Sequence, residues 1–256
     1  MVITKHKYQF GFSSIHRDSM YDIVMREQKA KKILSVLNDF YSENLRILSV
    51  LDMGCSTGII SNMLSRRFGK VVGIDIDKSA VEYAKGNYRC GNLEFAVCDA
   101  MSTGFLDESF DVVICAHVYE HVPSPSLLIY EIDRLLKAGG VCYFAAGNRL
   151  NLIEPHYSLP LLSLIPKPLA NIYLRILRRG EFYYENLLTF WGLKKLVSKF
   201  DVIDYTLKII ENPRKYCATE IIQPGSFKQE VLIRLVKIAY WLCPTYIWLL
   251  KKKKNT

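Results

Sequence analysis

Val50-Leu51-Asp52-Met53-Gly54-Cys55-Ser56-Thr57-Gly58 is the stretch that decides the fold, because it joins an apolar run to a helical pattern through a turn with two glycines. These glycines let a ligand approach the backbone, and the following helix offers free N–H groups at its start. A dinucleotide-binding loop would read GxGxxG, whereas the spacing here is GxxxG. Asp52 would repel a pyrophosphate and suits a ligand with an amine or another cation.

Short β-rich runs alternate with helical patterns around this turn, which is typical of parallel βαβ units. Strands are predicted at 46–51, 70–76, 93–98, 110–116 and 141–146, and helices at 19–38, 59–68, 79–88 and 126–137. We expect the first helix to lie across the mouth of the sheet and Gly139-Gly140 to end the last one. The predicted fold class is α/β, a Rossmann-like doubly wound, mostly parallel sheet.

The pattern changes after Asn148. Residues 151–180 hold four prolines among many leucines and isoleucines, which predicts a helical insert at about 149–184, after the fifth strand. A helix at 186–200 and a strand at 202–210 then complete the sheet, and 229–256 forms a C-terminal amphipathic segment. We therefore predict a single domain over 1–256, with its core at about 19–148 and 185–210.

Acidic residues follow two of the predicted strands. Asp75 ends the second strand, where a carboxylate can accept hydrogen bonds from both hydroxyls of a ribose. Asp77 fits a helix cap better than a ligand contact. Asp99 closes the third strand and could accept an amine proton, with an Asx-turn as the alternative.

The positive charge of the chain is confined to its second half. The 256 residues carry a formal net charge of +9, with 14 Lys and Arg against 15 Asp and Glu in residues 1–125, and 20 against 10 in the remainder. The basic excess is mixed with Leu-rich sequence, so no nucleic-acid partner is expected. The cysteines form no CxxC pair, and residues 1–18 lack the apolar stretch of a secretory signal, which favours a cytoplasmic protein.

The last apolar segment, 231–250, is twenty residues long but contains two basic residues and a proline. Because a membrane span needs about 20 consecutive apolar residues, a transmembrane helix is disfavoured. Trp241, Tyr246 and Trp248, which precede four lysines, fit an interfacial segment instead. We therefore expect peripheral membrane contact through 231–254, with packing of this segment on the domain as the alternative.

Five motifs resemble, in order, those of the class I S-adenosylmethionine-dependent methyltransferases. The resemblance is to the type 11 small-molecule branch, which includes the quinone-biosynthesis methyltransferases. The motifs are VLDMGCSTG (50–58), VVGIDID (71–77), CDA (98–100), FDVVICAHVYEHVPSP (110–125) and LLKAGGVCYFAAGN (135–148). The resemblance covers residues 30–150 and, more loosely, 185–210.

The resemblance implies that S-adenosyl-L-methionine is the cofactor. It places the methionine part on Asp52 and on the backbone of the glycine loop, the ribose on Asp75, and the adenine beside the residues that follow the second and third strands. The assigned residues are Asp52, Gly54, Cys55, Gly58, Asp75, Ile76, Asp99 and Ala100. The middle glycine of the family's loop is replaced by Ser56, which narrows the loop.

Methyl transfer from a sulfonium is an in-line displacement, so alignment supplies much of the rate and a base is needed only if the acceptor loses a proton. Three histidines follow C-terminal strand ends, where α/β sheets bind ligands: His117, His121 and His156. His121 belongs to the family's common EH pair and could instead orient the loop beneath the sulfonium. His156 opens the insert and could be a turn residue. No metal site is predicted.

The leading hypothesis is methyl transfer to an oxygen or carbon of a small acceptor that is hydrophobic or linked to a glycan or lipid. A nucleic-acid methyltransferase is less favoured, because no (N/D)PPY-like motif follows the fourth strand, where His117-Val118-Tyr119 stands. A non-catalytic module that docks at a membrane assembly is the remaining alternative. The intact set of cofactor residues argues against it.

Overall fold

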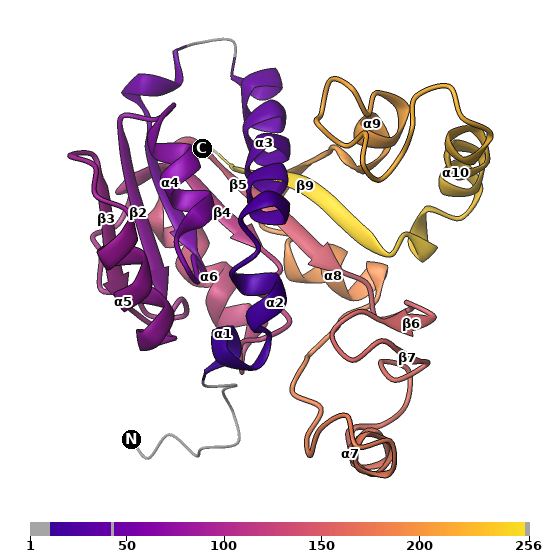
Figure 1. The fold of residues 1–256 in the computed structure, drawn as a ribbon. Helices are drawn as coiled ribbons and strands as arrows, with labels where there is room; N and C mark the ends of the chain where they lie inside the picture. The colour runs from indigo at the N-terminus through magenta and orange to yellow at the C-terminus, as the bar shows by residue number, and fades with distance from the viewer. Residues whose placement is uncertain (1–10, 42–43, 254–256) are drawn as a thin grey trace.

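The computed structural model describes residues 11–41 and 44–253. Within these residues the main sheet has seven strands in the order β3-β2-β1-β4-β5-β9-β8 (Figure 1). They are β1 Ser49–Met53, β2 Lys70–Asp75, β3 Leu93–Val97, β4 Phe110–Ala116, β5 Leu136–Gly147, β8 Phe200–Asp204 and β9 Thr245–Lys252. Neighbouring strands among the first five are parallel, whereas β9 is antiparallel to both β5 and β8. The predicted fold class is confirmed.

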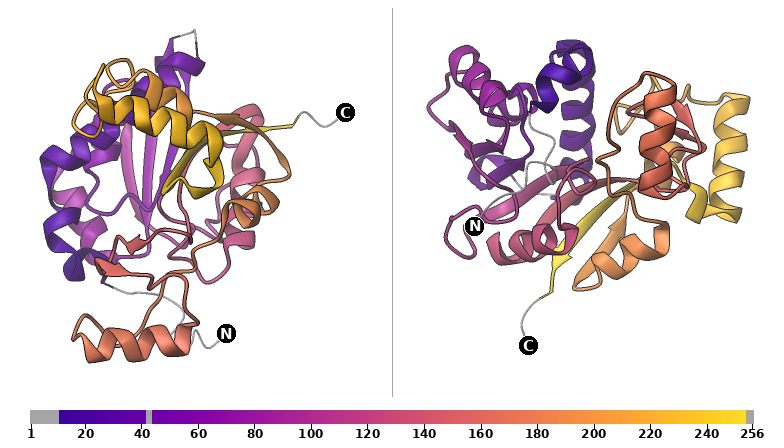
Figure 2. Two further views of the ribbon diagram at one scale, coloured as in Figure 1. Left: turned by 90° about the vertical axis from the view of Figure 1, so that its right-hand side faces the viewer. Right: turned by 90° about the horizontal axis from the view of Figure 1, so that it is seen from below.

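Helices cover both faces of the sheet (Figure 2). They include α3 Ile23–Phe40, α4 Ile59–Ser65, α5 Lys78–Asn87, α6 Pro125–Leu135 and α8 Phe190–Leu196. Strand residues alternate between two hydrophobic clusters, as a period of two requires. Val112 belongs to the same cluster as Ile33 of α3 and Val81 of α5, whereas its neighbour Val113 belongs to the cluster that contains Leu128 of α6.

Several boundaries differ from the predicted ones. Helix α3 begins only after its cap at Asp22 and packs along α4, so it covers a face of the sheet rather than its mouth. Gly139-Gly140 does not end α6, because β5 already starts at Leu136 and contains both glycines next to an irregularity in its pairing with β4. The expected strand at 202–210 is divided between β8 and the helix α9, Thr206–Glu211.

The C-terminal segment is not the expected amphipathic unit. It forms helix α10, Phe227–Ile238, a short turn η2, Tyr240–Leu242, and then β9, which lies between two other strands. Tyr246 and Trp248 are 0% and 1% exposed, so the prediction that they lie at lipid headgroup depth is wrong. Among the described residues, no helix has the length and apolar character to cross a bilayer. The expectations about residues 1–10 and Lys254 lie outside the described ranges.

The insert after β5 forms a small unit with its own core. It contains the two-stranded hairpin β6, Ile153–Glu154, and β7, Leu159–Pro160, followed by helix α7, Lys167–Ile176. Leu162 and Leu174 are fully buried in this core, which also includes Tyr183. The insert therefore has the packing to hold side chains in fixed positions beside the end of β5.

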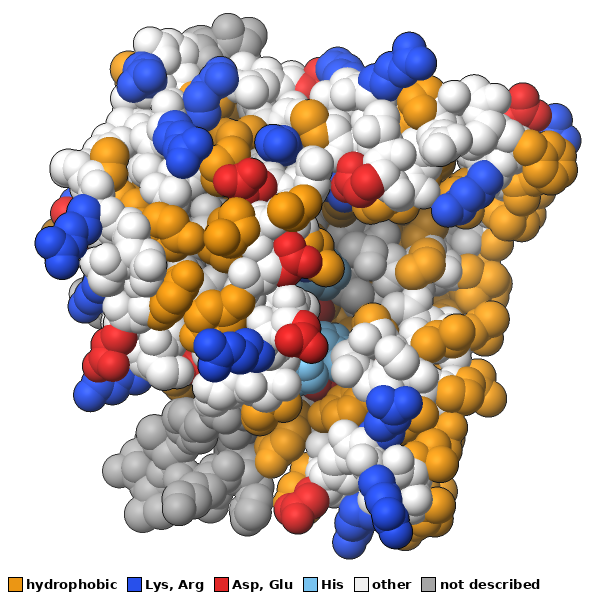
Figure 3. All heavy atoms as spheres, viewed as in Figure 1, with side chains coloured by type: hydrophobic (Ala, Val, Ile, Leu, Met, Phe, Trp, Pro, Cys, Tyr) orange, Lys and Arg blue, Asp and Glu red, His pale blue; other side chains and the backbone are white. Residues whose placement is uncertain are grey.

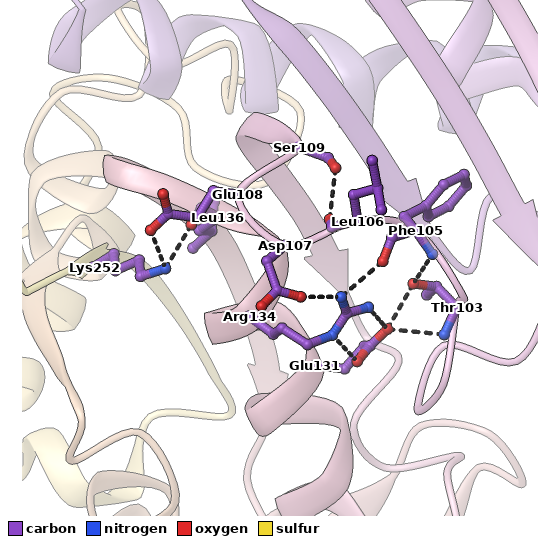
Figure 4. Close-up of polar contacts among 10 residues, drawn as sticks. All are labelled: Thr103, Phe105, Leu106, Asp107, Glu108, Ser109, Glu131, Arg134, Leu136 and Lys252. Atoms are coloured by element: carbon purple, nitrogen blue, oxygen red, sulfur yellow. Dashed lines mark hydrogen bonds and ion pairs between the residues drawn. The ribbon is translucent and has the colours of Figure 1, made fainter.

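A network of charged residues ties the loop before β4 to helix α6 (Figure 4). Arg134 donates to both oxygens of Glu131, to Asp107 and to the carbonyl of Phe105. On the same side of the sheet, Lys252 of β9 donates to the carbonyl of Leu136 at 2.8 Å. Each of these cations is already paired at the amino-terminal ends of β4 and β5, so this network is structural and the ligand site lies elsewhere.

Gly58 is expected to be far less tolerant of a side chain than a glycine of the same backbone conformation. Gly58 has φ +78°, and an added Cβ would lie 2.6 Å from Cβ of Ala84; Gly104 has φ +74° with nothing within 4 Å. Gly104→Ala should cost only backbone strain, about 1 kcal/mol, and Gly58→Ala about 1–3 kcal/mol more. Urea unfolding measures both, and equal losses would contradict the packing.

Candidate active site

The loop between β1 and α4 is built on a buried carboxylate. Asp52 is 3% exposed and accepts a hydrogen bond of 2.6 Å from the hydroxyl of Ser61. Burial raises the pKa of Asp52 to about 6. The N–H groups of Gly54 and Cys55 both donate to the carbonyl of Ile74, which fixes the loop against β2.

The two glycines of this loop serve packing in the structure. An added Cβ at Gly54 would lie 2.7 Å from Cγ2 of Val118, and one at Gly58 would meet Ala84 and Phe95. Protein side chains therefore occupy the space that a Cβ would need at both glycines, and the approach of a ligand to their backbone stays a prediction. The contact with Val118 places the loop after β4 directly on the glycine loop.

Asp75 connects the glycine loop to the end of β2. Its Oδ2 accepts from the N–H of Ser56 at 2.8 Å, and its Oδ1 accepts from the N–H of Asp77 at 2.9 Å. Burial raises the pKa of Asp75. Each carboxylate oxygen keeps further acceptor capacity, so a ligand with hydroxyl donors can bind here. Ile76 follows and is partly exposed.

The remaining residues assigned to the cofactor lie at the ends of neighbouring strands. Asp77 caps helix α5, as predicted, by accepting from the N–H groups of Ser79 and Ala80. Asp99, after β3, accepts from the N–H of Met101 at 2.8 Å in an Asx-turn, and Ala100 beside it is partly buried. The buried hydroxyl of Ser56 has no hydrogen-bond partner within the described ranges. The donors and acceptors here therefore fit a polar ligand such as S-adenosylmethionine.

Arg26 is a residue of this site that the sequence analysis missed. It is 8% exposed on α3 and lies within electrostatic range of Asp52 and Asp75. It occupies a helical stripe with Ala30 and Ile33, which are buried. An arginine inside an otherwise apolar stripe is the signal that could have revealed it, because a buried cation needs anionic partners.

The three predicted histidines converge near the ends of β4 and β5. His117 has a positive φ of 59°, a sparsely populated conformation, and its Nδ1 lies 3.1 Å from Oε1 of Glu120. The rings of His121 and His156 are 4.9 Å apart between centroids. The structure thus brings together histidines from two loops that are far apart in the chain.

His156 and Glu154 form the best oriented pair in this cluster. Glu154 is fully buried, and its Oε1 lies 2.6 Å from Nδ1 of His156. Its Oε2 accepts from the N–H groups of His156 and Tyr157, which locks the carboxylate in place. Burial lowers the pKa of His156, but the hydrogen bond that its ring donates to Glu154 and the charge of Glu185 outweigh burial, so the net pKa is raised.

His121 and Glu185 face each other without a hydrogen bond, with Nδ1 of His121 4.0 Å from Oε1 of Glu185. Burial lowers the pKa of His121 to about 4, so its ring is neutral at physiological pH. Burial raises the pKa of Glu185 to about 7. Neither oxygen of Glu185, nor Nδ1 of His121, has a hydrogen-bond partner among residues 11–41 and 44–253. Such orphaned polar groups indicate a place where a ligand or water completes the bonding.

The N-terminal segment bridges the two parts of the site. Ser13 donates through its N–H and its hydroxyl to Asp77, and the hydroxyl of Thr57 donates to the carbonyl of Met20. The ring of Phe12 lies 4.8 Å from that of His121. Figure 3 shows a hollow in this face of the molecule with histidine side chains inside it. The cofactor loops and the histidine cluster therefore form one continuous site.

Three side chains of the cluster could hold a metal ion. Glu120, His121 and His156 each offer one ligand atom, and these atoms lie within 4.8 Å of one another. Imidazole and carboxylate ligands suit zinc and related divalent ions. No metal was predicted from the sequence, and only the fold brings His156 of the insert beside Glu120 and His121.

The fold and the acidic residues at the strand ends agree with what comparisons with known proteins found. Residues 51–144 match the family described as a methyltransferase domain. The ubiquinone biosynthesis O-methyltransferase of Coxiella burnetii is 33% identical over 109 residues, covering 39% of this chain and 44% of that protein. The enzyme of that name from Psychrobacter cryohalolentis is 31% identical over 153 residues, covering 57% and 56%.

Among solved structures, the plantazolicin methyltransferase BpumL, crystallised with S-adenosylhomocysteine, superposes with a TM-score of 0.59. It is 18% identical and the match covers 94% of this chain and 89% of that one, which shows a shared fold. The chain spans about half the length of the curated relatives that it matches. Residues 51–144 are therefore similar to a methyltransferase domain, and the chain shares the fold of a solved methyltransferase, in agreement with its motifs.

Replacing Glu185 by glutamine is expected to stabilise the protein as the pH rises. Between pH 4.5, the ordinary pKa of this group, and about pH 7, its pKa in the folded protein, the carboxyl is ionised in the unfolded chain but still protonated in the folded one. The free energy of unfolding of the wild type therefore falls as the pH rises over that range. Glutamine does not titrate, and the gain of the variant should grow by roughly 2–3 kcal/mol from pH 4.5 to 7. Urea unfolding across this range measures it. For Glu181→Gln, at an exposed position, the difference in free energy of unfolding from the wild type should change little with pH. A difference for Glu185→Gln that is independent of pH would contradict the effect of burial on this carboxyl.

Proposed function

We propose that the protein transfers a methyl group from S-adenosylmethionine to a hydroxyl oxygen of a small, hydrophobic acceptor. The observation that carries this proposal is the pair of His156 and buried Glu154, which stands in the same site as the cofactor loops. A hydroxyl acceptor must lose its proton, and an oriented histidine is the group that most often accepts one.

S-adenosylmethionine supplies an electrophilic methyl group on a sulfonium. On the protein side, Asp75 accepts hydrogen bonds from ribose hydroxyls, and Asp99 with the backbone of Ala100 binds the adenine amine. The charges of Asp52 and Arg26 offset each other beneath the glycine loop. The backbone of Gly54, Cys55 and Gly58 forms that loop. Ile76 lies beside the adenine. The family resemblance implies these roles for the loop and strand-end residues, and the location of the acidic residues at the ends of β1, β2 and β3 supports them.

His156 acts as the general base. Because the carboxylate of Glu154 can only accept a hydrogen bond from Nδ1, the proton resides on that nitrogen and Nε2 is left as the acceptor. His117, paired with Glu120, orients the loop after β4, and the neutral ring of His121 lies 4.9 Å from the ring of His156. On methylation, the proton of the acceptor hydroxyl would pass to Nε2 of His156, and S-adenosylhomocysteine would leave as the bond between sulfur and the methyl group breaks.

The relatives support a hydrophobic acceptor, since their names place them in ubiquinone biosynthesis as O-methyltransferases. The apolar insert that contributes His156 also agrees with such an acceptor. A lipid-linked phenol or quinol is therefore the class to test first, and nucleic acid is not proposed as a substrate.

A pair of matched acceptors tests the proposal. The protein is incubated with S-adenosylmethionine and a catechol that carries an alkyl chain, or with the same compound bearing methoxy groups in place of both hydroxyls. We expect S-adenosylhomocysteine to form with the catechol only. Turnover of both compounds would show methylation at carbon, and turnover of neither, in a protein that binds the cofactor, would contradict this acceptor class.

A further inference from the structure

Helix α10 presents its apolar residues to solvent. Phe227, Val231, Leu235 and Ile238 recur at intervals of four, four and three residues, so they form one stripe, and they are 80%, 36%, 56% and 83% exposed. The buried residues of α10 are Gln229 and Val236, on the opposite face. A helix of a water-facing surface normally turns its apolar stripe toward the core, so this arrangement indicates a partner.

Helix α7 of the insert shows the same arrangement. Leu169, Ile172 and Ile176 lie on one side of the helix and are 56%, 47% and 72% exposed. The residues that α7 buries are Ala170 and Leu174, which face the core of the insert. Two separate helices therefore expose apolar stripes, and both stripes lie opposite the buried side chains.

The two stripes belong to one side of the molecule. Figures 1 and 2 place α7 and α10 on the same side, and Figure 3 shows hydrophobic side chains along the edge that joins them. Exposed apolar residues also occur outside the two helices, at Trp191 in α8 and at Trp241 and Leu242 in η2, and the two tryptophan rings are 5.6 Å apart. An apolar surface of this extent marks an interaction site.

The charges beside these stripes select the partner. Residues 167–180 contain four basic residues and no acidic one, and α10 contains three basic residues and one acidic one. A two-fold pair of this chain would bring basic residues against basic residues, which disfavours a second copy. Apolar residues and tryptophans with basic neighbours suit the surface of an anionic bilayer.

We propose that the outer faces of α7 and α10, together with Trp191 and Trp241, dock the protein on a bilayer that contains anionic lipid. This surface replaces the tail strand as the membrane contact, because β9 is buried in the sheet. The insert carries both α7 and the pair of Glu154 and His156, so docking brings that pair close to the lipid. The inference does not depend on which acceptor is methylated.

Vesicle flotation of the full chain tests the docking surface. The probes are vesicles of phosphatidylcholine alone and vesicles with equal parts of phosphatidylglycerol. The variants are Leu235→Gln with Ile238→Gln in α10, and Leu169→Gln with Ile176→Gln in α7. Ile47→Gln with Leu106→Gln is the matched control, because these residues are 71% and 82% exposed outside the surface. Circular dichroism and cofactor titration verify that each variant is folded.

We expect the wild type and the control to float with the anionic vesicles and each stripe variant to lose binding by about tenfold or more. Equal flotation of the stripe variants and the wild type would overturn the proposal, as would the absence of wild-type flotation. A concentration-dependent dimer that only the stripe variants break, without flotation, would assign the surface to a second copy. Flotation of a protein that does not bind the cofactor would contradict the proposed function and support the docking surface.

Discussion

Replacing His156 by alanine is expected to lower kcat for the alkyl catechol by about 100-fold or more, the usual contribution of a positioned general base. The affinity for S-adenosylhomocysteine should be unchanged, because this histidine lies outside the cofactor loops. The wild-type rate should rise with pH as the raised pKa of His156 is passed, since only the neutral ring accepts a proton. This limb of the profile should vanish in the variant.

Two matched variants make the assignment of the base specific. Glu154→Gln keeps the shape of the pair but removes the charge that supports protonation of His156, so the pH limb should move to lower pH. His117→Ala removes a second histidine whose ring nitrogen lies at hydrogen-bond distance from a glutamate, and its effect on kcat should be much smaller. A large loss with His117→Ala and none with His156→Ala would transfer the role of base to His117.

Asp75→Ala is expected to weaken binding of S-adenosylhomocysteine by about tenfold or more, because ribose loses its acceptor and two loop N–H groups lose theirs. Asp75→Asn keeps one acceptor oxygen and should lose less. Glu94→Ala, on the neighbouring strand β3, removes an exposed carboxylate and should bind as the wild type does. Calorimetric titration measures all three. A folded Asp75→Ala protein with wild-type affinity would remove Asp75 from the site.

The parallel part of the fold could be predicted from the sequence because each βα unit carries its own local signals. Strand β4, Phe110–Ala116, has the predicted bounds, since a strand buried on both faces reads as a continuous apolar run. Asp77 caps α5 as expected from its place before Lys78-Ser79. The glycine loop and the acidic residues at the strand ends could be recognised in the sequence, because each of these features is formed by residues that are close together in the chain.

The remaining features depend on contacts between distant segments. The apolar run at β9 reads like an interfacial segment. Only the position of β9 between β5 and β8 explains why this strand, which contains Trp248, is apolar on both of its faces. Arg26 reaches Asp52 from another element, and Glu154 and Glu185 join the histidines through the fold of the insert. No spacing rule in a single chain reports such convergence.

The central claim is that this chain binds S-adenosylmethionine at the loop of residues 52–58 and at Asp75. The most direct test is calorimetric titration of the purified chain with S-adenosylmethionine and with its demethylated product. We predict saturable binding of both at one site, with competition between them. The absence of heat with either ligand, in a protein shown to be folded, would contradict the account.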